Sequence, residues 1–111
     1  MRVFICTPVQ SRDRSEASVR MRVKELSRRL IEKGHEPVSH LDICTPGRWP
    51  DMVGADVALM IDCDGILLDN TRKGCRVCSV LESVARSITW KTFVVFHTSE
   101  EFRYIKERFV I

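Results

Sequence analysis

The segment RVFICTP, residues 2–8, places a run of four apolar residues directly before a threonine and a proline. A strand with one face in water alternates apolar and polar residues, whereas an unbroken apolar run is typical of a strand buried on both faces. Proline lacks the N–H that a strand interior needs, so Pro8 predicts the start of a loop. We therefore expect a first strand in a parallel sheet that is covered by helices on both sides.

The rest of the chain alternates between helical and extended patterns. Apolar residues recur at helical spacing from Ser15 until Gly34 ends the helix, at Val19, Val23, Leu26, Leu30 and Ile31. Further strands are predicted at 36–40, 63–68 and 92–96, further helices at 51–61, 75–87 and 99–108, and loops at 42–50 and 69–74. This order predicts one α/β domain over residues 1–111, with a short parallel sheet between helices.

The same pattern predicts which side chains form the core. Cys6, Ile66, Leu68, Val94 and Phe96 should be buried in the sheet, and Leu26, Leu30, Leu81 and Val84 should pack onto it from the helices. The basic face of the first helix, with Arg20, Arg22, Lys24, Arg28 and Arg29, is interpreted as solvated surface.

Composition excludes several classes of protein. The net charge of +3 is small and the basic residues are scattered, so a nucleic-acid polymer is not an expected partner. No run approaches the ~20 apolar residues of a membrane span, and the first residues are too short an apolar run for a signal peptide. We expect no membrane partner and a cytoplasmic protein.

The five cysteines are an odd number in a chain without an export signal, so we interpret them as small buried hydrophobes. Cys75 and Cys78 have C-x-x-C spacing, but a zinc site needs a second pair, and the three histidines are dispersed. No metal and no cofactor are predicted.

Ligands of open α/β sheets bind outside the carboxyl ends of strands, where the strand order reverses. The polar loops 7–13 and 69–75, which follow the first and third strands, are therefore the candidate site. Gly74 with its basic neighbours could receive an anion, although a glycine before a helix is also ordinary turn chemistry.

Three carboxylates are candidates for chemistry. Asp56, Asp64 and Glu82 lie on or near predicted strand and helix ends, where a carboxylate can be a nucleophile, a base or a ligand anchor. A turn role for Asp64, which precedes Gly65, and a solvated position for Glu82 are the alternatives.

The order of these segments resembles the nucleoside 2-deoxyribosyltransferase-like superfamily, and most closely its branch called domain of unknown function 4406, over roughly residues 1–96. The residues that carry the resemblance are VFICTP at 3–8, LIEKGHEPV at 30–38, DVALMIDCD at 56–64, LLDN at 67–70 and KGCRV at 73–77. The resemblance implies a flavodoxin-like or Rossmann-like three-layer sandwich with strand order 2-1-3-4.

The resemblance also implies candidate catalytic residues. In the superfamily's transferases a glutamate four residues after a glycine attacks the anomeric carbon, and a carboxylate suits a transition state that is cationic at the sugar. Gly74 matches that glycine and Asp56 a substrate-binding or supporting aspartate, which places Cys78 at the nucleophile. A second register places Glu82 there. Arg72 also replaces the usual serine two residues before the glycine.

Three functions follow as hypotheses. The first is a nucleoside- or nucleotide-binding protein with a degenerate catalytic site, its ligand held by Thr7, Pro8, Asp56, Asp64, Asp69, Asn70 and Gly74. The second is an active N-glycosidase or deoxyribosyltransferase that uses Glu82, and the third is a protein-interaction module with a vestigial pocket. The resemblance implies a homo-oligomer, for which Met52, Met60 and Trp90 are the expected exposed residues.

Overall fold

The structure is a computed structural model that describes residues 1–8, 16–42, 49–98 and 109–110. Its strands are β1 (Arg2–Cys6), β2 (Glu36–Val38), β3 (Gly65–Leu68), β4 (Val94–His97) and β5 (Phe109–Val110). Its helices are α1 (Glu16–Glu32), α2 (Trp49–Ile61) and α3 (Arg76–Ser87), with short 3-10 turns η1 (His40–Asp42) and η2 (Asn70–Arg72). The helix predicted at 99–108 lies outside the described residues.

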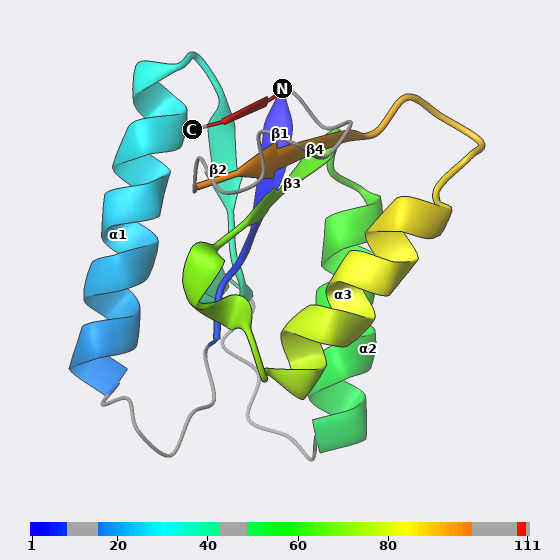
Figure 1. The fold of residues 1–111 in the computed structure, drawn as a ribbon, viewed down its shortest axis with the longest axis horizontal. Coiled ribbons are helices and arrows are strands. Elements are labelled where there is room, and N and C mark those ends of the chain that lie inside the picture. Colours follow the sequence, from blue (N-terminus) through cyan, green and yellow to red (C-terminus); the bar gives the residue numbers. More distant parts are fainter. Residues whose placement is uncertain (9–15, 43–48, 99–108, 111) are drawn as a thin grey trace.

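The five strands form one parallel sheet in the order β2-β1-β3-β4-β5. Helix α1 lies on one face of the sheet, and α2 and α3 lie together on the other (Figure 1). This confirms the predicted three-layer α/β sandwich and the strand order 2-1-3-4, to which β5 adds a strand beside β4. After β1 the chain passes to β2 on one side and then to β3 on the other, so the strand order reverses between β1 and β3.

The core has two layers because successive side chains of a strand point to opposite faces of the sheet. Val3 and Ile5 of β1 pack with α1, whereas Phe4 and Cys6 pack with α2 and α3. The predicted core residues are buried with two exceptions: Val94 and Val84 are only partly buried. Burying each large apolar side chain contributes about 1.5 to 3 kcal/mol, so these layers hold the sheet and helices together.

Two expectations about exposure were wrong. Met60 was expected at the surface, but it has no exposed area and packs in the core on the α2 and α3 face. Ile31 was counted with the apolar face of α1, but 61% of it is exposed. Met60 continues the helical spacing of Val53 and Val57, which directs it into the core. Ile31 follows Leu30, which already occupies the buried stripe of α1, so Ile31 is turned towards solvent.

Helix α1 ends in a glycine-dependent turn. Gly34 has φ of +82°, a left-handed conformation that side-chain-bearing residues rarely adopt. The N–H groups of Gly34 and His35 donate to the carbonyls of Ile31 and Leu30, which satisfies the open end of the helix. This turn directs the chain into β2.

Strand β2 forms one edge of the sheet. Its Glu36 N–H donates to the Met1 carbonyl at 2.9 Å, so that residue faces β1. The next residue, Pro37, stands opposite Val3 in the register. Because alternate residues of a strand face alternate neighbours, the backbone of Pro37 faces the free edge.

Candidate functional site

A buried carboxylate lies at the carboxyl end of β3. Asp69 has no exposed area, and its side chain accepts a hydrogen bond from the Thr7 hydroxyl at 2.6 Å, where β1 ends. It also accepts from the Thr71 hydroxyl at 2.8 Å and the Thr71 N–H at 3.3 Å. The loops that follow β1 and β3 are therefore joined at the point where the strand order reverses.

Arg22 of α1 completes this cluster. Its guanidinium donates to both oxygens of Asp69, at 2.7 and 3.1 Å, and also contacts Glu25 at 3.2 Å. Burial alone would raise the pKa of Asp69, but the hydrogen bonds from Arg22, Thr7 and Thr71 hold it well below its usual range. In turn, the hydrogen bond to Asp69 raises the pKa of Arg22.

The interpretation of the whole basic face of α1 as solvated surface was therefore wrong at Arg22. The partner of Arg22 lies 47 residues away in the sequence, so no local pattern connects the two. The available signal was Asp69 itself, because a carboxylate directly after a buried strand requires donors nearby.

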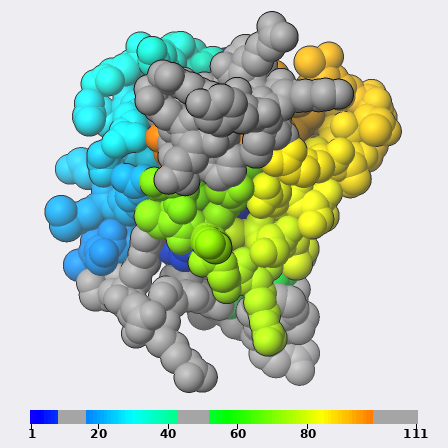
Figure 2. All heavy atoms as spheres, viewed as in Figure 1, coloured from blue at the N-terminus to red at the C-terminus, as the bar shows by residue number. Residues whose placement is uncertain are grey.

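The segment after Asp69 is fixed to the neighbouring strand. The Asn70 N–H donates to the Thr98 hydroxyl at 2.9 Å, and the Thr98 N–H donates to the Leu68 carbonyl at 3.2 Å. Asn70 itself is exposed. On the molecular surface this segment lies between α1 and α3 (Figure 2). Thr98 was not among the predicted site residues.

Gly74 serves the turn between η2 and α3. Its φ is +83°, and a Cβ built there would meet no atom within 4 Å. The glycine is thus required by its backbone conformation and not by close packing, which supports the turn interpretation. Pro8, the other loop residue expected near a ligand, is buried directly after Thr7.

Glu82 of α3 is held by two arginines. Arg72 donates to both of its oxygens, at 3.1 and 3.2 Å, and Arg86 donates to one at 3.1 Å. Burial opposes ionisation, but these hydrogen bonds lower the pKa of Glu82 below its ordinary value. Glu82 is therefore ionised and paired. A quarter of its side chain is exposed, so it is still accessible.

Cys78 lies in the core under α3. It is 1% exposed, and its backbone carbonyl accepts a weak hydrogen bond from the Cys6 thiol at 3.8 Å. The contact with the Cys6 side chain, together with burial, raises the pKa of Cys78 far above its ordinary value. Of the two candidates for the nucleophile position, Glu82 alone has an exposed side chain.

Asp56 is paired with a histidine that the sequence did not indicate. Asp56 lies in α2 and is 2% exposed, and its Oδ1 is 2.7 Å from Nδ1 of His40 in η1. Burial raises the pKa of Asp56, and the contact with His40 opposes that shift. This pair lies beyond the carboxyl end of β2, on the sheet face opposite α1.

A second histidine, His97, ends β4. It has no exposed area, and burial lowers its pKa to about 4, with a further contribution from the positive charges of Arg72 and Arg86. Within the described ranges, the carboxyl edge of the sheet thus holds two buried carboxylates, Asp56 and Asp69, and a buried imidazole, His97.

Asp64 is not brought to this edge. Its carboxylate accepts from the Arg2 N–H at 2.8 Å, and its backbone bonds both Arg2 and Val94, before β3 begins. Asp64 therefore lies at the amino edge, a strand length away from Asp69. This placement supports the turn interpretation of Asp64.

The described residues hold no group of three or more potential metal ligands. The four described cysteines are free thiols, and Cys75 is the least buried of them. Cys44 lies outside the described part of the chain.

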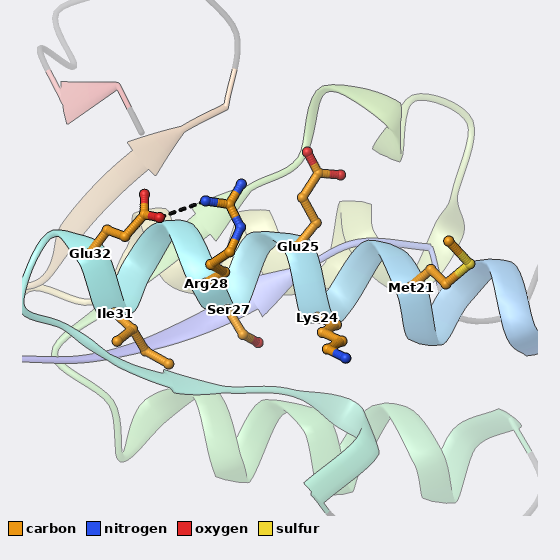
Figure 3. A pocket seen from close by; sticks show the side chains of 7 residues that line it. All are labelled: Met21, Lys24, Glu25, Ser27, Arg28, Ile31 and Glu32. Carbon is orange, nitrogen blue, oxygen red and sulfur yellow. Dashed lines mark hydrogen bonds and ion pairs between the residues drawn. The ribbon is translucent and has the colours of Figure 1, made fainter.

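A groove of about 620 Å³ runs along the outer side of α1. Among the described residues, its lining comes entirely from that helix, including the exposed Met21 and Ile31 (Figure 3). None of the predicted site residues lines it, so we do not assign the candidate site there.

Exposed apolar residues bear on self-association. Trp90 is 65% exposed, as expected, while Met52 is partly buried. Self-association stays a prediction.

None of the helices in the described ranges is long and apolar enough to cross a membrane. Comparison with known proteins finds no family model and no curated protein that matches this chain.

Proposed function

We propose that this protein binds a nucleoside or nucleotide at the carboxyl ends of β1 and β3 and that its catalytic site is degenerate. One observation carries the proposal: Thr7 and Asp69 are hydrogen-bonded to each other where the strand order reverses. Open α/β sheets bind their ligands at this position. The resemblance of the sequence to the deoxyribosyltransferase-like superfamily supplies the class of ligand.

The surface beside this cluster has groups suited to such a ligand. Asn70 is exposed and its amide can donate to and accept from a sugar hydroxyl or a base. Lys73 is exposed on the adjoining turn and Arg76 is exposed at the start of α3, and both would attract a phosphate. Asp69 is saturated by its own donors, so its role is to hold Thr7 and the η2 turn in place for binding.

The nucleophile positions support a loss of catalysis. Glycosyl transfer requires a carboxylate that can approach the anomeric carbon. Cys78 is a buried thiol whose raised pKa keeps it protonated. Glu82 accepts three hydrogen bonds from arginines, which neutralise its charge and occupy its oxygens.

The test is binding of nucleosides, 2′-deoxynucleosides and 5′-mononucleotides, measured by thermal shift and titration calorimetry. We expect at least one to bind, and Asn70→Ala to weaken it by about three- to tenfold, the effect of one hydrogen bond. Glu32→Gln, an exposed substitution at the far end of α1, is the matched control. If no member of the panel binds the wild type, the proposed function is wrong.

A second candidate function is base release by Glu82, favoured by the ionised and partly exposed state of that side chain. Chromatography of deoxynucleosides incubated with the wild type separates the two candidates. We expect no free base. Turnover that is abolished in Glu82→Gln but retained in Cys78→Ser would establish the enzyme and refute the degenerate site.

A further inference from the structure

We infer that His40 and Asp56 form a dyad in which Asp56 fixes the imidazole with Nδ1 protonated and Nε2 serves as an outward base for the ligand. The dyad deepens the proposed function, because the ligand it would meet is the nucleoside or nucleotide at the carboxyl edge. Nε2 of His40 would accept a hydrogen bond from a hydroxyl or an N–H of that ligand.

The short contact sets the tautomer. The distance of 2.7 Å between His40 Nδ1 and Asp56 Oδ1 is that of a charge-assisted hydrogen bond. A carboxylate only accepts, so Nδ1 must carry the proton, and in the neutral ring the lone pair is then on Nε2. Because Asp56 is 2% exposed, water competes little for its carboxylate.

The ring is also held in position by its own turn. The Ser39 N–H donates to the Asp42 carboxylate at 2.7 Å, and the Leu41 N–H donates to the Ser39 hydroxyl at 3.2 Å. These bonds fix the backbone on either side of His40. With Asp56 holding one nitrogen, the imidazole has little rotational freedom left to lose on binding a ligand.

The strand order places the dyad next to the proposed ligand site, because β2 is the direct neighbour of β1. Strand β2 ends at Val38, opposite Phe4 of β1, and His40 follows two residues later in the η1 turn, beyond the carboxyl end of β2. Val38 packs on the α2 and α3 face, and the bond to Asp56 of α2 places His40 on that same face. The side chain of His40 is 16% exposed, which leaves part of the ring accessible.

The position of the proton can be tested on the free protein. Long-range ¹H–¹⁵N spectra of the full chain, with labelled histidine, distinguish protonated from unprotonated ring nitrogens. We expect His40 to show a protonated Nδ1 and an unprotonated Nε2 in its neutral form. Asp56→Asn places an amide that can donate to Nδ1, and the proton should then move to Nε2.

The ligand contact is tested with a substitution that preserves the internal bond. In His40→Asn the amide nitrogen can still donate to Asp56, but nothing replaces Nε2. We expect His40→Asn to keep the unfolding midpoint within a few degrees and to bind the best ligand of the panel about three- to tenfold more weakly. His35→Asn, at the opposite edge, is the control and should bind as the wild type does.

The outcomes separate the dyad from the proposed function. If the wild type binds a nucleoside and His40→Asn binds it equally well, the dyad is refuted and the proposed function stands. If nothing in the panel binds, the proposed function fails, and the spectra alone decide the dyad. The dyad is overturned if neutral His40 has its proton on Nε2, or if the tautomer is unchanged in Asp56→Asn. It is supported if the proton is on Nδ1 in the wild type and moves to Nε2 in Asp56→Asn.

Discussion

The two edges of the sheet use polar groups in different ways. At the amino edge, side chains bond the backbone: Asp64 accepts from the Arg2 N–H, and Lys91 donates to the carbonyls of Ile61 and Cys63. At the carboxyl edge, side chains also bond each other, and the carboxylates of Asp56 and Asp69 are buried there together with the imidazole of His97. Bonds to the backbone satisfy polar groups at the ends of helices and strands. Buried side-chain networks cost desolvation free energy and fix one geometry, which is typical of functional sites.

The largest expected difference between the edges concerns their aspartates. Asp69→Ala leaves Arg22 without its main partner and Thr7 without its acceptor, and should lower the free energy of unfolding by about 3 to 5 kcal/mol. Asp64→Ala removes one exposed hydrogen bond and should cost about 1 kcal/mol or less. Urea unfolding of both variants measures the difference. Equal losses would show that the two edges do not differ.

The next effect belongs to the amino edge, where strands approach closely. A Cβ at Gly65 would lie 2.6 Å from the Val94 carbonyl oxygen, a backbone atom that cannot move aside. Gly65→Ala should therefore destabilise the protein by about 1 to 3 kcal/mol. Gly54→Ala, in α2 with nothing within 4 Å, is the matched control and should stabilise by about 0.5 to 1 kcal/mol. A neutral Gly65→Ala would contradict the close approach of β3 and β4.

Acid should act on the carboxyl edge first. The pKa of His97 falls from 6.5 to about 4 on folding, so between these values the unfolded chain binds more protons and stability decreases as pH falls. This decrease should reach about 1 to 3 kcal/mol and be absent in His97→Gln. His35 at the amino edge has a pKa lowered by burial and by the amino terminus, but it is half-buried against Phe96. We expect His35→Gln to leave most of the pH dependence intact in thermal unfolding followed from pH 7 to pH 5.

A second acid step should follow from Asp69. Its folded pKa lies below the ordinary value of 3.8, so its contribution to stability is complete above that pH and is lost as pH falls further. Asp69→Asn should flatten the pH dependence of unfolding below pH 4. A slope equal to that of the wild type there would mean that other carboxylates carry the acid step.

The smallest expected effect concerns helix ends. Lys91 donates to carbonyls at the end of α2, whereas Cys75, the N-cap residue directly before α3, makes no side-chain capping bond. Cys75→Asp should cap α3 and raise the free energy of unfolding by about 0.5 to 1 kcal/mol. Cys75→Ala, which cannot cap, is the control. A loss of stability in Cys75→Asp would indicate that packing of the thiol outweighs the cap.

The fold could be predicted because apolar periodicity reports directly on which elements face a sheet. The first strand was predicted to end before Pro8, and β1 ends at Cys6; α1 and α3 differ from the predictions by only one or two residues at either end. Thr7, Asp69 and Asn70 could be predicted as neighbours because parallel strands bring their carboxyl ends together. The pairing of Arg22 with Asp69 and of His40 with Asp56 could not be predicted. Each pair joins two separate elements, and the packing of those elements in three dimensions determines which side chains meet.

Pro37 has a consequence for how sheets grow. The free edge of β2 has no N–H at the position that faces outward, since that position is a proline in a strand of three residues. An incoming strand would meet a carbonyl with no donor beside it, and the ladder could not continue. The pyrrolidine ring of Pro37 therefore blocks the addition of a strand along β2, which is the usual start of edge-to-edge aggregation.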